Sequence, residues 1–300
     1  MSTPKISFKI AIAIATAGRC DVVSETIALL ASQSRVADEL LICPAKDEDF
    51  NVSCLRSYPQ KARVIRGPIG LPRQRNVLLD ATDSDIVIFF DDDFLPSDDY
   101  VREVELLFAT HPQLVVITGK LLADGALGPG IDHGAGMRIL QAAGPNLELK
   151  TITATYNGYG CNMAIRMNTV RKYGIRFDER LPLYAWLEDV DFSRQLSSHG
   201  DIVQAARLRG VHLGTKGSGR SPGLRLGYSQ VANPIYLARK GTMGWTLALK
   251  HLGKNLLANT VRSFYPEPWV DRRGRLIGNF RALLDLFSGV MTPERALKDR

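Results

Sequence analysis

A run of five apolar residues, Ile86 to Phe90, constrains the fold of this chain more than any other feature. A strand with no polar alternation is expected to be buried on both faces, as in the parallel sheet of an α/β protein. Shorter β-branched runs at residues 10–15, 39–43 and 63–65 alternate with helical patterns. The sequence therefore predicts a doubly wound sheet, in which ligands bind beyond the carboxyl ends of the strands.

Helical patterns and later strands complete this outline. Helices are expected over residues 21–33, 72–79 and 188–199, and another is expected to begin at Ser97, where carboxylates favour a helix start. Further strands are expected at residues 114–118, 151–156 and 161–165, which makes the sheet mixed. Residues 123–136 show neither a helical nor a strand period, so they are predicted to form a glycine-rich functional loop.

Three consecutive carboxylates, Asp91, Asp92 and Asp93, follow the apolar strand directly. Their mutual repulsion at the end of a buried strand costs stability unless a cation or donor groups neutralise them. Mg²⁺ or Mn²⁺ suits the position, because hard cations prefer oxygen ligands and bind phosphates at the same time. The alternative is an Asp-rich turn that caps the next helix, but residues 97–99 already serve that purpose.

Five segments in order carry a resemblance to a known family. The strand end I-V-I-F-F-D-D-D at residues 86–93 resembles the D-x-D motif of the family 2 glycosyltransferases, which have the nucleotide-diphospho-sugar transferase fold. The other four segments are I-A-I-A-T-A-G-R (12–19), G-L-P-R-Q-R-N (70–76), G-C-N-M-A-I (160–165) and W-L-E-D-V-D-F-S-R-Q-L (186–196). Over residues 9–215, the chain is thus identified as a member of that inverting family, of the bacterial envelope and exopolysaccharide type.

The resemblance assigns a donor site and a metal site. It implies that the nucleotide-sugar contacts Thr16, Arg19, Arg73, Arg75, Asp91 and Asp92. It also implies that Asp91 and Asp93 hold Mn²⁺ or Mg²⁺. His212 lies where some relatives place a further metal ligand, although a structural histidine is the alternative reading. The donor is expected to be a UDP-, GDP- or dTDP-linked sugar.

On the acceptor side, the resemblance makes Asp189 the catalytic base and has Glu188 orient the acceptor or Asp189. A sugar hydroxyl is a weak nucleophile, so a general base that removes its proton accelerates the reaction. Trp186 and Asn162 fall in the matching acceptor-side segments. Asp191 points to another helix face and is interpreted as a solvated or structural carboxylate. The reaction implied is one in-line displacement that inverts the anomeric configuration.

Some departures from the family pattern are visible. Cys43-Pro44-Ala45-Lys46-Asp47 replaces the aspartate that ends the second strand in many members, which leaves Asp47 as a candidate for reading the base. No Q-x-x-R-W sequence follows Asp189, so transfer of a single sugar is favoured over processive synthesis. The rival readings are a sugar-phosphate nucleotidyltransferase and a non-enzymatic membrane- or nucleic-acid-binding module. Thr16-Ala17-Gly18-Arg19 has one glycine only, which argues against the first rival.

Charge is divided unevenly along the chain. Residues 207–300 carry a net charge of +12 and residues 1–206 carry −5, which together give the chain's +7. We therefore predict a catalytic domain at residues 1–221, for the nucleotide-sugar and the acceptor, and a basic, mainly helical extension at residues 222–300. Aromatic residues in the extension are too sparse to indicate nucleic-acid binding.

Apolar and aromatic residues beside Lys and Arg in this extension suit helices in an anionic membrane interface. The alternative is that they pack on the catalytic sheet and present a basic face to water. A lipid-linked saccharide acceptor favours a peripheral position on the inner face of the cell membrane. The four cysteines lack metal-site spacing, and a reduced cytoplasm suits them.

Overall fold

The computed structural model describes residues 7–144, 151–216 and 222–298. Within these residues, nine strands form one sheet in the order β3-β2-β1-β4-β8-β6-β9-β5, and β7 pairs with β9. The strands are β1 (Ile10–Thr16), β2 (Glu39–Pro44), β3 (Lys61–Val64), β4 (Ile86–Asp91), β5 (Phe94–Pro96), β6 (Leu114–Asp124), β7 (Ile152–Ala154), β8 (Asn162–Arg166) and β9 (Asp201–His212).

The first four strands are mutually parallel, while β8 runs antiparallel to both β4 and β6. Strand β4 lies inside the sheet between β1 and β8, and its apolar residues from Ile86 to Phe90 are buried. This confirms that the unbroken apolar run is a strand covered on both faces. The doubly wound mixed sheet that the sequence predicts is therefore observed.

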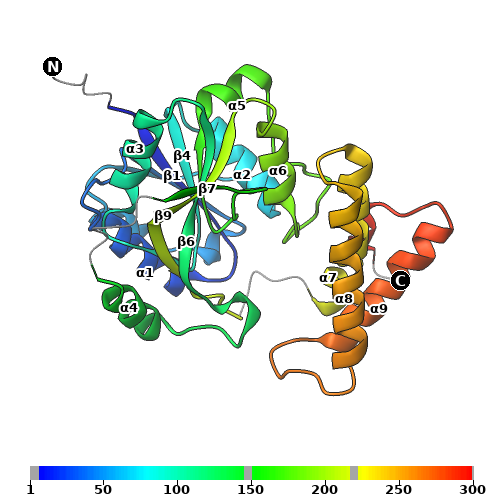
Figure 1. Ribbon diagram of the computed structural model, residues 1–300. Helices are drawn as coiled ribbons and strands as arrows, with labels where there is room; N and C mark the ends of the chain where they lie inside the picture. Colours follow the sequence, from blue (N-terminus) through cyan, green and yellow to red (C-terminus); the bar gives the residue numbers. More distant parts are fainter. Residues whose placement is uncertain (1–6, 145–150, 217–221, 299–300) are drawn as a thin grey trace.

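Side chains of β1 alternate between two cores. Ile10, Ile12 and Ile14 join the core under α1 (Cys20–Ala31) and α3 (Tyr100–Thr110). Ala11 and Ala13 join the core under α2 (Leu71–Asp80), α5 (Met167–Tyr173) and α6 (Glu188–Leu196). The period of two along the strand thus places one helical layer on each face of the sheet (Figure 1).

The prediction of a glycine-rich loop at residues 123–136 is wrong at both ends. Strand β6 continues to Asp124, and α4 (His133–Ala142) begins inside the predicted loop. Asp132 caps this helix by accepting a hydrogen bond from the backbone N–H of Ala135 at 2.8 Å. Gly136 faces Leu213 so closely that an added Cβ would lie 2.7 Å from it. Gly136 therefore obscures the helical pattern in the sequence, but its lack of a side chain allows α4 to pack against Leu213. Similarly, α3 begins at Tyr100 rather than at Ser97.

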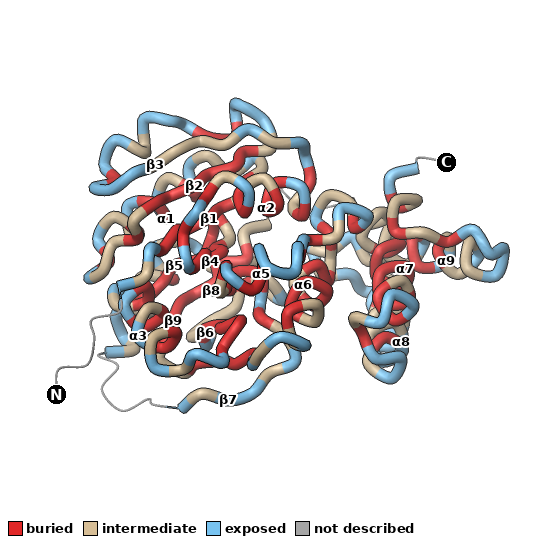
Figure 2. Tube along the Cα trace, turned by 90° about the horizontal axis from the view of Figure 1, so that it is seen from above, coloured by how far each residue is buried: buried red, intermediate tan, exposed pale blue. Residues whose placement is uncertain are grey.

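The C-terminal region is helical, as the sequence predicts, and consists of α7 (Gly223–Lys240), α8 (Trp245–Arg262) and α9 (Arg272–Phe287). These helices stand beside the sheet (Figure 1), and α7 is the most deeply buried of them (Figure 2). The predicted domain division between residues 221 and 222 falls at the edge of a segment, 217–221, that lies outside the described residues. No helix in the described part of the chain is long and apolar enough to cross a membrane.

Helix α7 is docked on the segment around α6 by both apolar and charged contacts. Leu181 and Leu187 pack in one cluster with Leu237 of α7. The Lys240 ammonium lies 2.7 Å from a carboxylate oxygen of Asp191, which is fully buried. Asp191 therefore has a structural role, one of the two readings that its sequence position allows.

Candidate active site

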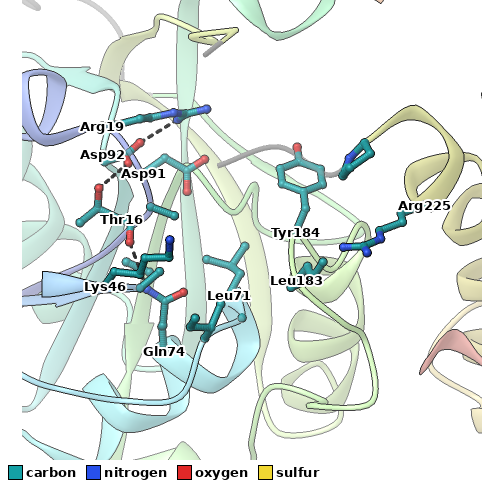
Figure 3. A pocket seen from close by; sticks show the side chains of 16 residues that line it. Thr16, Arg19, Lys46, Leu71, Gln74, Asp91, Asp92, Leu183, Tyr184 and Arg225 are labelled. Atoms are coloured by element: carbon teal, nitrogen blue, oxygen red, sulfur yellow. Dashed lines mark hydrogen bonds and ion pairs between the residues drawn. The ribbon is translucent and has the colours of Figure 1, made fainter. Parts of the chain in front are cut away.

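A cavity of about 600 Å³ opens at the carboxyl ends of β1, β2 and β4. Residues just after each of these strands line it, as expected for the ligand site of a doubly wound sheet. The lining also includes the start of α2, the segment before α6 and the first turn of α7. Figure 3 shows ten of these residues by name: Thr16, Arg19, Lys46, Leu71, Gln74, Asp91, Asp92, Leu183, Tyr184 and Arg225.

Thr16, Arg19 and Asp92, all predicted to bind nucleotide-sugar, form one cluster on the cavity wall. The Thr16 hydroxyl donates to Asp92 at 2.7 Å, and the Arg19 guanidinium donates to the other oxygen at 2.8 Å (Figure 3). Burial raises the pKa of Asp92 to about 6, while Arg19 and Thr16 act in the opposite direction. Both Asp92 oxygens are thus engaged within the protein. The carboxylate holds the cavity wall in shape.

Asp91, Asp93 and His212 come together at the edge of the cavity, with one ligand atom from each within 4.8 Å of the others. The Nε2 atom of His212 lies 3.4 Å from Asp93 and 3.8 Å from Asp91. The buried Oδ1 of Asp93 has no hydrogen-bond partner among the described residues. Burial alone would raise the pKa of Asp93, but His212 and Arg19 hold it below its usual range. An ionised carboxylate with one oxygen outside any hydrogen bond that the described residues form, beside a histidine and a second carboxylate, fits a divalent cation.

Asp124 supports this cluster and was missed by the sequence analysis. Its Oδ1 lies 2.9 Å from Nδ1 of His212, which leaves Nε2 facing the two aspartates. Metal-binding histidines commonly have such a carboxylate on the second ring nitrogen, because it fixes the orientation of the ring. Burial lowers the pKa of His212, yet Asp124 and Asp93 together raise it to about 10.

Glu188 and Asp189 begin α6, where carboxylates are favoured by the helix dipole. Asp189 accepts hydrogen bonds from the backbone N–H groups of Gly160 at 3.0 Å and Val190 at 2.8 Å, which fix its orientation. Burial raises the pKa of Asp189, and these backbone donors oppose the shift. Asp189 is not among the described residues that line the cavity itself.

The two arginines predicted to contact the donor have different environments. Arg73 is half exposed, and its Nε lies 3.7 Å from Glu179. Arg75 is 2% exposed and donates to Glu188 at 2.6 Å and to Asp91 at 3.1 Å. Burial raises the pKa of Glu188 to about 8, and Arg75 opposes this shift. Neither arginine is among the described cavity-lining residues.

The two residues predicted on the acceptor side are not brought together. Asn162 is fully buried, and its Oδ1 accepts from the Thr118 hydroxyl at 2.6 Å. Trp186 is half-buried, and its ring centroid lies 5.7 Å from that of His251 in α8. The Trp186 carbonyl accepts from Asn233 of α7 at 2.8 Å. Both residues therefore contribute to packing. Asn162 packs within the sheet, and Trp186 packs against the C-terminal helices.

Further cavity residues were missed. The Gln74 amide donates to the Thr16 carbonyl at 3.2 Å and to the Cys43 carbonyl at 2.7 Å, and so it joins the ends of β1 and β2. Its place in the motif at residues 70–76 was the available signal. Tyr184 and Arg225 face the cavity from the side opposite Arg19 (Figure 3). Nothing in the local sequence distinguishes them from other surface residues.

The segment before α6 has an unusual backbone. Leu183, Ala185 and Leu187 have φ values of 55°, 50° and 76°, in the left-handed region that non-glycine residues seldom adopt. Such conformations cost about 1–3 kcal/mol each and persist only where the surroundings enforce them. The conformation alternates along the segment, since every second residue from Leu183 to Leu187 lies in this region.

Sheet order, cavity position and carboxylate cluster together define the class. The fold is the glycosyltransferase A-type fold, an α/β sheet with a nucleotide-sugar site at the carboxyl ends of its parallel strands. The family model described as glycosyl transferase family 2 matches residues 11–173, and the chain belongs to that family. It is a nucleotide-sugar glycosyltransferase. None of the curated proteins matches its sequence.

Solved structures share this fold at low sequence identity. Staphylococcus aureus TarS, residues 1–349, in complex with UDP-GlcNAc, is 16% identical with a TM-score of 0.57, over 96% of this chain and 82% of that chain. The mannosyltransferase PcManGT from Pyrobaculum calidifontis, in complex with GDP-Man and Mn²⁺, is 12% identical with a TM-score of 0.56, over 98% and 86%. Both structures are similar to this chain along nearly its whole length, including the helical C-terminal region.

Proposed function

We propose that this protein is a metal-dependent, inverting glycosyltransferase that moves a sugar from a nucleotide-diphospho-sugar to an acceptor hydroxyl. The observation that carries the proposal is the cluster of Asp91, Asp93 and His212 beside the cavity. These three residues would hold Mn²⁺ or Mg²⁺. When bound, the ion supplies positive charge against the leaving diphosphate.

Asp189 acts as the general base in this mechanism, and its two backbone hydrogen bonds orient it. It takes the proton of the acceptor hydroxyl while that oxygen forms a bond to the anomeric carbon. The bond from the anomeric carbon to the diphosphate oxygen breaks, and its electron pair leaves with the nucleoside diphosphate. One displacement of this kind inverts the anomeric configuration.

The donor is a UDP-, GDP- or dTDP-linked sugar. The cavity volume of about 600 Å³ suits a ligand of this size. The similar structures were solved with UDP-GlcNAc and with GDP-Man and Mn²⁺, which supports a nucleoside diphosphate and a divalent cation. Asp47, the substitute reader of the base, is exposed and paired with Arg66, whereas Lys46 lines the cavity. We therefore favour Lys46 over Asp47 at the base end.

Thermal unfolding with UDP, GDP, CDP and dTDP, each with and without Mn²⁺, tests the proposal. Stabilisation measures ligand binding to the folded state. One nucleotide should raise the Tm only in the presence of Mn²⁺, and Asp93→Ala should abolish the rise. Leu127→Ser is the control, since Leu127 is exposed and lies outside the cavity lining. Full transfer in excess chelator would contradict metal dependence, and a product of retained configuration by NMR would contradict inversion.

We also propose a peripheral position on the inner face of the cell membrane, with a lipid-linked saccharide as acceptor. The outer faces of α8, α9 and the segment between them support the contact with a membrane. α9 exposes an apolar stripe at helical spacing, and its most exposed member, Phe287, has 86% of its surface in solvent. The exposed large apolar residues here are Trp245, Leu249, Leu257, Val261, Phe264, Tyr265, Trp269, Ile277, Phe280, Leu284 and Phe287.

The positive charge of the outer faces of α8 and α9 favours a membrane, rather than a second copy of the chain, as the partner of this surface. Lys250, Lys254 and Arg273 are exposed beside the apolar residues. Of the acids nearby, Glu267 is paired with Arg272, and Asp271 is exposed but outnumbered by these basic residues. Two such basic faces repel each other, whereas anionic headgroups attract them. The apolar residues would enter the interface between headgroups and acyl chains.

Sedimentation with vesicles tests this position. Anionic vesicles should retain the protein at low salt, and neutral vesicles should retain much less. The variant Ile277→Ser/Phe280→Ser/Leu284→Ser should lose retention while keeping transfer to a soluble acceptor, and Leu127→Ser should behave like the unsubstituted protein. Equal retention by both kinds of vesicle, or by neither, refutes the proposal. A dimer that the triple variant dissociates would assign the surface to a second copy.

A further inference from the structure

We propose that Arg75 is a positioning residue that holds the metal-side carboxylate Asp91 and the helix carrying Asp189 in one fixed arrangement. The inference rests on the proposed function, since it assigns Asp91 to the donor side and Asp189 to the base. It replaces the contact with the nucleotide that sequence resemblance implies for Arg75.

Arg75 joins three elements that are distant in the sequence. Its Nη1 donates to Glu188 at the start of α6 at 2.6 Å, and its Nη2 donates to Asp91 at the end of β4 at 3.1 Å. Nη2 also donates to the carbonyl of Gly160, just before β8, at 2.8 Å. A planar guanidinium can reach three acceptors in fixed directions, which a lysine ammonium on a flexible stem cannot reproduce.

Aromatic packing fixes the plane of this guanidinium. The Arg75 Cζ atom lies 5.3 Å from the ring centroid of Phe89 and 5.4 Å from that of Phe177. With 2% of its surface exposed, Arg75 has no room for a direct contact with a donor. The side chain therefore acts on the site through the groups that it holds.

Gly160 connects this arrangement to the base. Its carbonyl accepts from Arg75, while its N–H donates to Oδ2 of Asp189 at 3.0 Å. An added Cβ at Gly160 would lie 3.2 Å from both Nη1 of Arg75 and Oε1 of Glu188. A side chain at this position would press on the ion pair. One residue, Gly160, therefore connects Arg75 to Asp189 through its two flanking peptide groups.

Positioning of this kind matters because a misplacement of about 1 Å at a reacting centre can cost about 10²-fold in rate. Arg75 also offsets the repulsion among three carboxylates, those of Asp91, Glu188 and Asp189, that surround it. Because Asp91 also lines the cavity, loss of Arg75 is expected to affect donor binding as well, but to lower turnover more strongly. A residue that contacts the nucleotide would instead change mainly the KM for the donor.

The test compares steady-state sugar transfer by Arg75→Lys, Glu188→Gln and the double variant. We expect kcat at saturating Mn²⁺ to fall by about 10- to 100-fold in Arg75→Lys, and the donor KM to change by a smaller factor. The double variant should be no slower than the slower single variant, because the effects of substituting two residues that act as one unit do not add up. Arg63→Lys is the matched control, since Arg63 pairs with the buried Glu39 at the amino end of β2, away from the cavity.

Each outcome decides the matter. An unchanged kcat in Arg75→Lys, a change confined to the donor KM, or multiplied losses in the double variant would overturn the inference. If Arg75→Lys does not fold, Gly160→Ala serves in its place, because its added methyl group presses on the same ion pair while Arg75 and Glu188 are both retained. Absence of transfer by the unsubstituted protein would instead contradict the proposed function.

Discussion

Replacement of Asp124 by alanine tests the metal site through a residue that does not itself belong to the cluster. Asp124 holds Nδ1 of His212 at 2.9 Å, and so it aims Nε2 at Asp91 and Asp93. Loss of such a supporting carboxylate typically weakens metal affinity about 10- to 100-fold, which corresponds to about 1.4–2.7 kcal/mol. We expect Asp124→Ala to bind Mn²⁺ more weakly within that range.

Titration calorimetry with Mn²⁺ in the presence of the stabilising nucleotide measures the effect directly. Tyr159→Phe is the matched control, because the Tyr159 hydroxyl donates to the other oxygen of Asp124 at 3.1 Å and its removal leaves His212 held. Asp124 also accepts a hydrogen bond from the backbone N–H of Ala126, so its replacement can lower the stability of the fold itself. The Tm of Asp124→Ala without Mn²⁺ is therefore compared with that of the unsubstituted protein. Equal Mn²⁺ affinity in Asp124→Ala and the unsubstituted protein would show that Asp124 does not support the metal site.

Three other outcomes are expected. Asp189→Asn should bind donor normally and lose at least about 10²-fold in kcat, and a near-normal rate would remove Asp189 as the base. Lys240→Met should destabilise the protein by about 2 kcal/mol in urea unfolding, because it takes a charged hydrogen bond from the buried Asp191, and unchanged stability would contradict this. Burial alone would raise the pKa of Asp178, but Lys240 and Tyr236 lower it. The resulting stabilisation is present above the unfolded pKa of about 4 and is lost as the pH falls through the folded pKa, so Asp178→Asn should flatten the acid limb of stability against pH.

The central strand and the metal cluster could be predicted because their signals are local or follow from the family pattern. Burial of residues 86–90 follows from composition alone, and the position of Asp91 and Asp93 follows from the strand end. His212 joins them because β9 runs beside β5 and β6, which no local pattern encodes. Only the resemblance pointed to it.

Contacts between distant segments account for what the sequence did not reveal. Asp124 lies 88 positions from His212, inside a stretch read as a loop because its glycines conceal the start of α4. Arg75 was assigned to the nucleotide because a cation near a diphosphate site is the simplest reading. Its burial depends on Phe177 and Glu188, more than 100 positions away, and only the tertiary packing specifies these neighbours.

The C-terminal helices differ in what they contribute, and composition could not separate them. Arg225 at the start of α7 lines the cavity, while Asn233 holds the carbonyl of Trp186 in the strained segment before α6. α7 is therefore part of the wall that faces the donor. The exposed basic and apolar residues lie instead on α8 and α9, the outer helices (Figure 2). α7 therefore joins the cavity wall to the two helices whose outer faces carry the proposed membrane surface.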